Sequence, residues 1–361
     1  MDSQPVFIGM DLGTFKTSVV SSNGTRDSLF SAVGWPKDHV ARAILGRDVV
    51  FGTDVVEKRL ALKVCRPFER GALKYLDSSE SGVAEEKVAE HIEAARLLIK
   101  HAVELTRPKS GAPVFGVIGA PSRASIINKK FIMDVASDAF DAVVIAPEPF
   151  TVAYGMNALT DALVIDIGAG TIDICPLYST YPTDEDQVTV PLGGDFVDEA
   201  FMRLMGEQFP EAELSTNIAR EIKEKYGFVH DIDEKAVAML DVKARPTEFD
   251  VSGPLKEACL TLVEPIIEGL REVISRFDPE FRRAMLSNII LAGGGSQLNG
   301  LDRLIEQSLE AYGGGKVSKV GDSVFAGAAG ALKLAMSMPA DQWDQFRLQT
   351  QSQSTELADA A

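Results

Sequence analysis

The chain has 361 residues, a length that predicts about two or three domains and allows a core of ordinary stability. Its composition, 45% hydrophobic and 25% charged residues, is that of a globular protein and excludes a fibrous one. The formal net charge of −17, from 36 basic and 53 acidic residues, excludes broad electrostatic attraction to nucleic acid or to an anionic membrane surface, because both are polyanions.

The amino-terminal stretch and the cysteines indicate a cytoplasmic protein without a direct membrane anchor. MDSQPVFIGM has neither the basic region nor the long apolar region of a secretion signal, and no run reaches the roughly 18 apolar residues that span a bilayer. Cys65, Cys175 and Cys259 lie far apart and are expected to be reduced core residues. The four histidines show no metal-ligand spacing, so a zinc site is not expected.

Apolar runs that end in small or acidic residues alternate with helical patterns along the chain. Apolar residues at 3–4 spacing predict a helix over 84–106, and the polar stretch at 349–361 predicts a disordered tail. This alternation is typical of an α/β protein. The runs predict strands at 6–10, 114–120, 141–146, 162–167 and 288–292.

Two strand-end patterns occur twice, in the same order. MDLGT at 10–14 matches IDIGA at 165–169, and GVIGAPS at 116–122 matches IILAGGGS at 289–296. Chance recurrence of apolar and small residues is the alternative, but both pairs occur in the same order and at similar offsets. The repeat predicts two related α/β domains.

Acidic residues and glycines follow both strands of the first pair. Glycine lets backbone N–H groups approach an anion, and phosphate is the natural ligand. Asp11 and Asp166 would repel it, by about 4 kcal/mol for unit charges about 4 Å apart at an effective dielectric of about 20, unless a cation lies between them. Mg²⁺ is the expected cation, so the pair predicts a site for a metal–nucleoside phosphate. A single such loop would be better explained as an ordinary turn.

Two common nucleotide motifs are absent from the sequence. YGGGKVS at 312–318 is not a P-loop, because Val317 follows Lys316 where the motif requires Ser or Thr. No predicted strand is followed by Gly-x-Gly-x-x-Gly. The phosphate loops are therefore of another kind.

Glu148, in APEPFTVAYG at 146–155, lies at a predicted helix start, because Pro149 suits the first helical position. The helix dipole there favours an ionised carboxylate, which could orient or deprotonate a water that attacks a phosphate. From this stretch alone, an ordinary acidic helix start is the better explanation.

Taken together, these motifs resemble those of the actin superfamily, which includes bacterial actins, sugar kinases and the large heat-shock chaperones. The resemblance spans about residues 5–337. The two phosphate loops of that superfamily are resembled by DLGTFKTSVV and DIGAGTIDI, and its two connecting segments by IGAPSRAS and VGDSVFAGAAGALKLA. Its adenosine loop is resembled by LAGGGSQLNGLDRLI, and the stretch after its second phosphate hairpin is matched by LGGDFVDEAF. VCRPFERGALKYL and EPFTVAYG are most similar to the MreB branch, whereas AREIKEKYG is closer to eukaryotic actin. Because it is MreB-like but divergent and has a polar tail, the chain most resembles, within that branch, the filament proteins that align magnetosomes.

The resemblance implies the actin-like ATPase fold, an α/β architecture of two RNase H-like domains that flank a nucleotide cleft, each with a smaller subdomain. Domain I would cover 1–160, with a small subdomain at about 34–95, and would be joined by a C-terminal helix at about 322–337. Domain II would cover 161–321, with a small subdomain at about 202–279, and 338–361 would form a polar tail, disordered in part.

The resemblance also implies residue roles. Asp11 and Asp166 would position Mg²⁺ through water, and Glu148 would polarise the attacking water with Thr171 beside it. The residues expected to bind ATP are Gly13, Thr14, Phe15, Lys16, Gly168, Ala169, Gly170, Gly193, Gly194, Arg220, Lys223, Glu224, Gly294, Gly295, Ser296 and Gln297.

Several positions depart from the MreB pattern or receive no role. Lys16 stands where MreB has Asn and is expected either at a phosphate or in solvent, and Arg220 stands where MreB has Glu. Ala169 replaces a glycine and is expected to have a negative φ. Asp173 is expected on the outer face of its hairpin. Small residues at 326, 327, 329 and 330 are expected to serve helix packing.

The implied function is that of a bacterial cytoskeletal ATPase that polymerises with ATP, uses hydrolysis to control filament turnover and organises or positions magnetosomes. Its partners would be further copies of itself and organelle-associated adaptor proteins, not nucleic acid. A small-molecule kinase of the same fold is the alternative, although the chain is short for a substrate-binding insertion. A chaperone is a third possibility, although no substrate-binding domain follows residue 337.

Overall fold

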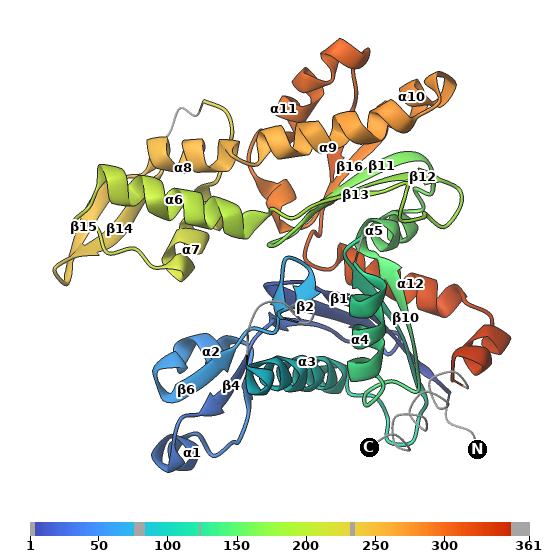
Figure 1. Ribbon diagram of the computed structural model, residues 1–361, viewed down its shortest axis with the longest axis horizontal. Coiled ribbons are helices and arrows are strands. Elements are labelled where there is room, and N and C mark those ends of the chain that lie inside the picture. Colours follow the sequence, from blue (N-terminus) through green and yellow to red (C-terminus); the bar gives the residue numbers. More distant parts are fainter. Residues whose placement is uncertain (1–3, 76–83, 123, 232–234, 348–361) are drawn as a thin grey trace. The chain divides into compact units, whose positions relative to one another are not determined.

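The computed structural model describes residues 4–75, 84–122, 124–231 and 235–347, and it divides into two compact units (Figure 1). Unit 1 comprises Met1–Asn157 and Val324–Ala361, and unit 2 comprises Ala158–Ser323. The stretch 349–361, for which a disordered tail is predicted, lies outside the described residues.

Unit 1 is built on a five-stranded sheet of order β10-β9-β1-β2-β3. β1 is parallel to β9 and β9 to β10, whereas β2 and β3 continue the other side of the sheet with antiparallel pairing. The strands are β1 (Val6–Leu12), β2 (Lys16–Ser21), β3 (Arg26–Phe30), β9 (Val114–Ala120) and β10 (Ala142–Pro147). The three strands predicted in this part of the chain are confirmed. Every residue of β9 is buried, as is typical of a strand inside a parallel sheet covered on both faces.

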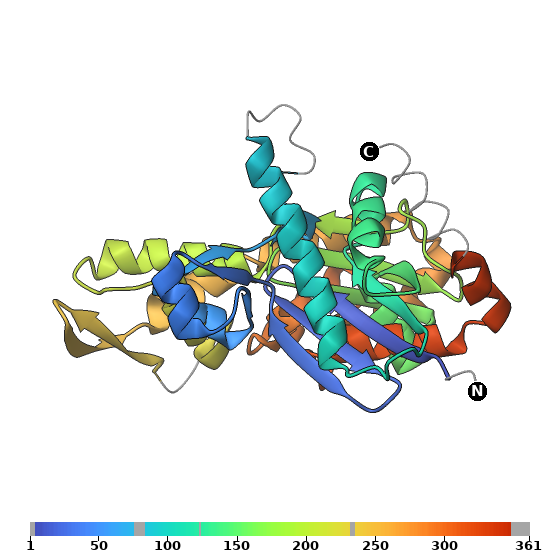
Figure 2. The same cartoon turned by 90° about the horizontal axis from the view of Figure 1, so that it is seen from below.

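Helices cover both faces of this sheet. α3 (Glu85–Leu105) confirms the helix predicted over 84–106; it packs with α4 (Ile126–Ala136) in one core with Ile8 and Met10. In Figure 2, α3 (teal) crosses this face. α5 (Glu148–Met156) and α12 (Ala326–Ser337) pack together, with α12 against the opposite face of β1.

Small residues allow these close approaches around α12. A Cβ on Gly9 would lie 2.0 Å from the Ala328 carbonyl oxygen, and a Cβ on Gly330 would lie 1.8 Å from the Thr151 carbonyl oxygen. The packing interpretation is therefore confirmed for Gly330. It is wrong for Ala329, which is exposed.

Replacing Gly330 with Ala is expected to lower the free energy of unfolding by about 1–3 kcal/mol, because the added methyl group has no room between α12 and α5. Gly206→Ala is the matched control: this helical glycine has open space around its Cβ position, and the substitution should be neutral or stabilise by up to about 1 kcal/mol. Urea unfolding followed by circular dichroism measures both. Equal midpoints for the two variants would contradict the packing argument.

A smaller subdomain follows β3 in the chain. Its sheet has the order β5-β4-β6, and Ala32, Val50, Val55 and Leu62 form a core of their own. Asp38 caps the first helix by accepting a hydrogen bond from the Ala41 backbone N–H at 2.8 Å. The elements are β4 (Val33–Pro36), α1 (His39–Leu45), β5 (Val50–Phe51), α2 (Thr53–Glu57), η1 (Arg59–Ala61), β6 (Leu62–Cys65) and the hairpin β7 (Phe68–Glu69) and β8 (Ala72–Leu73).

Residues 340–347 are helical and are held to unit 1 by an aromatic anchor. Trp343 is 2% exposed and stacks on Phe115 with ring centroids 5.1 Å apart. Its indole N–H donates to the Ala335 carbonyl at 3.2 Å. This part of the segment 338–361, which is predicted to be a polar tail, is therefore ordered by the packing of Trp343, and its polar composition gave no sign of this.

Unit 2 is built on a second five-stranded sheet, of order β13-β12-β11-β16-β17. β11 is parallel to β16 and β16 to β17, with antiparallel β12 and β13 on the other side, so the pairing pattern of unit 1 recurs. The strands are β11 (Thr160–Ile167), β12 (Ile172–Tyr178), β13 (Val188–Val190), β16 (Ile289–Ala292) and β17 (Val317–Lys319). The repeat and the strands predicted at 162–167 and 288–292 are confirmed.

The helices of unit 2 share one hydrophobic core with this sheet. α9 packs on β12 and β13, while α6, α7 and α8 pack together, and β14 pairs with β15 in a separate two-stranded sheet. The elements are α6 (Gly194–Gln208), α7 (Thr216–Tyr226), β14 (Val237–Val242), β15 (Arg245–Asp250), α8 (Ser252–Leu260), α9 (Val263–Arg276), α10 (Pro279–Leu286), η2 (Gly294–Gln297), α11 (Leu301–Ser308) and η3 (Glu310–Tyr312).

The cysteines lie in these cores, as predicted. Cys65, Cys175 and Cys259 are buried and free, and burial raises the pKa of the Cys65 and Cys259 thiols to about 11. Across the described ranges, no helix combines the length and the apolar character that crossing a membrane requires.

Candidate functional site

The first part of the candidate site is the turn between β1 and β2. The Gly13 N–H donates to the Lys16 carbonyl at 3.1 Å, and a Cβ on Gly13 would lie 2.6 Å from that same oxygen. The Ser31 hydroxyl donates to the Gly13 carbonyl at 2.7 Å. The turn is thus fixed by hydrogen bonds on both sides of Gly13. Because the φ of Gly13 is not positive, the glycine is needed here for the missing space and not for its backbone conformation.

The next three residues of this turn have different surroundings. The Thr14 hydroxyl accepts a hydrogen bond of 3.1 Å from the Gly71 N–H, which ties the turn to the β7–β8 hairpin. The Phe15 ring packs edge-on against Phe30, with ring centroids 5.0 Å apart. Lys16 is exposed, in agreement with the solvent alternative.

Asp11 lies at the end of β1 with its carboxylate against a glycine. Burial raises the pKa of Asp11 to about 6. A Cβ on Gly327 would lie 2.7 Å from Asp11 Oδ2, so the glycine in α12 leaves room for the carboxylate. A cation nearby would favour the ionised form.

Glu148 lies near the same edge of the sheet. It is the first residue of α5 and follows the cap residue Pro147, so Pro149 takes the second helical position and not the first. Its side chain is buried, and a Cβ on Gly119 would lie 3.3 Å from Glu148 Cγ. Gly119 is the register partner of Asp11 between β1 and β9. The fold therefore brings two sequence-predicted carboxylates next to one glycine.

The second loop, between β11 and β12, rests on the first turn of α6. The Gly168 N–H donates to the carbonyl of buried Thr171 at 2.9 Å, and Ala169 has the negative φ that was expected. The Gly194 N–H donates to the Gly168 carbonyl at 3.0 Å, and the Asp195 N–H to the Ala169 carbonyl at 2.8 Å. These bonds fix the loop to a helix start.

Asp166 has a glycine beside its carboxylate, as Asp11 has. Gly293 follows β16 with φ +73°, and a Cβ on it would lie 2.4 Å from Asp166 Oδ1. The predicted adenosine loop begins here. Gly294 has open space at its Cβ position, and the Ser296 hydroxyl donates to the Gly293 carbonyl at 2.7 Å and accepts from Gln297 Nε2 at 3.0 Å.

The position expected for Asp173 is wrong. Its side chain is 1% exposed, not on an outer face, and its Oδ1 accepts a hydrogen bond of 2.5 Å from the Thr189 hydroxyl. Asp173 is also the register partner of Asp166 between β11 and β12. Directly opposed residues share a face of a sheet, so Asp173 belongs to the surroundings of Asp166.

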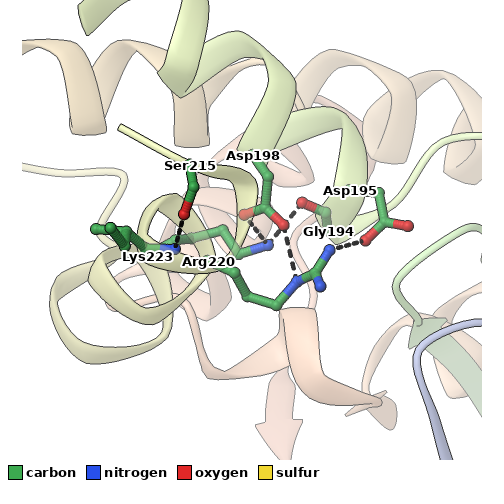
Figure 3. Close-up of polar contacts among 7 residues, drawn as sticks. Gly194, Asp195, Asp198, Ser215, Arg220 and Lys223 are labelled. Carbon is green, nitrogen blue, oxygen red and sulfur yellow. Dashed lines mark hydrogen bonds and ion pairs between the residues drawn. The ribbon is translucent and has the colours of Figure 1, made fainter. Parts of the chain in front are cut away.

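The residues expected at the ribose and adenine divide into two groups. Arg220 and Lys223 point from α7 toward the start of α6, where they contact Asp195, Asp198 and Gly194 (Figure 3). Glu224, one residue further along α7, is exposed. Asp195 and Asp198 were not predicted from the sequence, because they meet Arg220 and Lys223 across two different helices and no local spacing joins them.

The strand-end carboxylate of each unit, taken by itself, is of the kind that a hydrated Mg²⁺ ion uses. Within the described ranges, no group of three or more His, Cys, Asp or Glu residues could cage a metal. Mg²⁺ needs no such cage, since it keeps several waters and takes one or two carboxylates together with phosphate oxygens. Asp11 in unit 1 and Asp166 in unit 2 are each one such carboxylate, at a strand end with room left by a glycine.

Comparison with known proteins shows the family of the chain. The family model described as MreB/Mbl protein matches residues 5–338. The chain belongs to the MreB/Mbl family. Among relatives, it is 37% identical over 341 residues to actin-like protein MamK of Paramagnetospirillum magneticum, covering 94% of this chain and 95% of that protein. It is 36% identical to actin-like protein MamK of Magnetospirillum gryphiswaldense, covering 94% and 92%.

Solved structures show that this MreB/Mbl family member has the actin-like fold, as predicted. The chain is similar to a MamK double helical filament, with a TM-score of 0.87 and 37% identity over 93% of this chain and all of that one. It is also similar to a non-polymerising MamK mutant bound to AMPPNP, with a TM-score of 0.69 and 36% identity over 92% of this chain and 99% of that one.

Proposed function

We propose that the chain is a bacterial actin-like ATPase that polymerises into filaments with ATP and uses hydrolysis to control filament turnover. The observation that carries this proposal is its similarity, over 93% of the chain, to a MamK double helical filament. The magnetosome role is inferred from the MamK relatives: the filament would run in the cytoplasm along these organelles, with adaptor proteins as further partners.

ATP is the proposed nucleotide, because a MamK relative binds the ATP analogue AMPPNP. Each unit would contribute one phosphate loop, Gly13–Lys16 from unit 1 and Gly168–Gly170 from unit 2. Their backbone N–H groups suit phosphate oxygens. Gly294 to Gln297, with Lys223 and Glu224, are proposed for the adenosine.

Asp11 and Asp166 are proposed to hold Mg²⁺ through its waters. When bound, the ion neutralises phosphate charge. Glu148 is proposed to orient the attacking water and accept its proton, with Thr171 as a second group that orients the water. The helix dipole at the start of α5 favours an ionised carboxylate, which suits a base.

Sedimentation with and without ATP, combined with a phosphate-release assay, tests the proposal. We expect the protein to pellet in ATP and Mg²⁺ and then to release inorganic phosphate. A protein that stays monomeric at every concentration in ATP would refute the filament function. Transfer of the phosphate to a sugar or an acid, without pelleting, would favour the kinase alternative.

A further inference from the structure

Four charged side chains join the first turn of α6 to α7, and we refer to Asp195, Asp198, Arg220 and Lys223 as the α6–α7 cluster (Figure 3). Arg220 Nε donates to Asp198 Oδ2 at 3.0 Å and Arg220 Nη2 to Asp195 Oδ1 at 2.6 Å. Lys223 Nζ lies 2.7 Å from Asp198 Oδ1. The Asp198 carboxylate thus contacts both Arg220 and Lys223, and the Arg220 guanidinium contacts both Asp195 and Asp198.

The α6–α7 cluster is largely shielded from water. The Asp198 side chain is fully buried, and the side chains of Arg220 and Lys223 are only 7% and 11% exposed. Burial raises the pKa of Asp198, while Lys223 and Arg220 oppose that shift. Ion pairs removed from water are weakly screened by salt, so the cluster is a firm tie between the two helices.

The cluster continues into the second phosphate loop. Lys223 Nζ donates to the Gly194 carbonyl at 2.6 Å, and the N–H groups of Gly194 and Asp195 donate to the carbonyls of Gly168 and Ala169. A Cβ on Gly193 would lie 2.6 Å from both of those carbonyl oxygens, so the helix start and the loop are in close contact. A continuous path of polar contacts therefore runs from α7 to the loop.

We propose that Arg220 and Asp198 are positioning residues for the Gly168–Gly170 loop and that Arg220 is not a ribose ligand. Two donors of the guanidinium are directed at protein carboxylates, which fixes its plane and orients the first turn of α6. Fixing that turn holds the carbonyls of Gly168 and Ala169 and, with them, the orientation of the following N–H groups of Ala169 and Gly170, which would meet the phosphate; the Gly168 N–H is already bonded to Thr171. The proposal rests on the proposed function, because the loop must bind the phosphates of ATP.

Arg220→Lys tests this assignment, because lysine keeps the charge but cannot make both contacts. Binding of Mg-ATP and of Mg-2′,3′-dideoxy-ATP is measured by titration below the protein concentration at which it pellets. We expect the variant to bind both nucleotides about 10-fold more weakly, as is found when a partner that orients a binding group is lost. The two nucleotides are expected to lose affinity equally, because both carry the phosphates that the positioned loop binds and they differ only in the ribose hydroxyls.

A loss confined to ATP would identify Arg220 as a ribose ligand and overturn the proposal, and so would an unchanged affinity for both. Failure of the wild-type protein to bind ATP would instead refute the proposed function. Arg271→Lys is the control, since it alters an exposed ion pair with Glu264 in α9 and should change neither affinity.

A second readout needs no nucleotide. In Arg220→Lys, amide hydrogen exchange at Gly194 and Asp195 is expected to become faster, because these N–H groups donate to the loop. If Arg220→Lys does not fold, Asp195→Asn is used, since its side chain is 40% exposed and the Arg220–Asp198 contact remains. It should give a smaller loss in the same pattern. Unchanged exchange in the folded variants would overturn the proposal.

Discussion

Replacing Glu148 with Gln is expected to slow ATP hydrolysis by about 10²–10⁴-fold while leaving ATP-dependent assembly in place. Glutamine has nearly the same size and fills the same buried space beside Gly119, but its amide cannot accept the proton of an attacking water. Phosphate release and pelleting are measured on the same sample. Filaments should form and persist, because the step that limits their lifetime is slowed.

Glu280→Gln is the control for this experiment. Glu280 also lies in the first turn of a helix, α10, but it is exposed and belongs to no proposed site. Its hydrolysis rate should equal that of the unchanged protein. Unchanged hydrolysis in Glu148→Gln would remove Glu148 from the proposed role, and loss of both hydrolysis and assembly would show that its role is not confined to the chemical step.

Mg²⁺ is expected to strengthen ATP binding, and replacing Asp166 with Asn is expected to make this gain in affinity smaller by about 10- to 100-fold. This is the range found when groups that hold a metal's ligands are lost. The reason is that the amide carries no charge for the hydrated ion. In EDTA, the variant should bind ATP at least as tightly as the unchanged protein, because one carboxylate no longer repels the phosphates. Calorimetric titration of ATP in Mg²⁺ and in EDTA measures both effects.

Asp161→Asn is the matched control, since Asp161 lies on the same strand, β11, but is exposed at its far end. It should leave the effect of Mg²⁺ unchanged. If Asp166→Asn keeps the full effect of Mg²⁺, or if it weakens binding equally in Mg²⁺ and EDTA, Asp166 does not hold the ion.

The sheets and their strand-end loops could be predicted because their signals are local. The apolar runs before Asp11 and Asp166 and the glycines after them lie within a few residues of one another. The repeat of this pattern then implied two sheets of one topology, which the strand orders confirm. Helix α3 could be predicted equally well, because its apolar residues follow the 3–4 residue spacing of a helix along its whole length.

The features that the sequence did not reveal depend on distant contacts. Asp173 was expected on the outer face of its hairpin, but β12 is buried along nearly all of its length. Trp343 orders a polar segment by stacking on Phe115, far away in the sequence. Asp198 meets Arg220 across 22 positions, so no local pattern joins them.

Electron microscopy of the full chain in ATP and Mg²⁺, compared with the nucleotide-free protein, tests the central claim most directly. We expect filaments only with ATP, and a map of them should show the nucleotide phosphates against the Gly13–Lys16 and Gly168–Gly170 loops. Absence of filaments at every protein concentration in ATP, or a nucleotide bound away from both loops, would contradict the account.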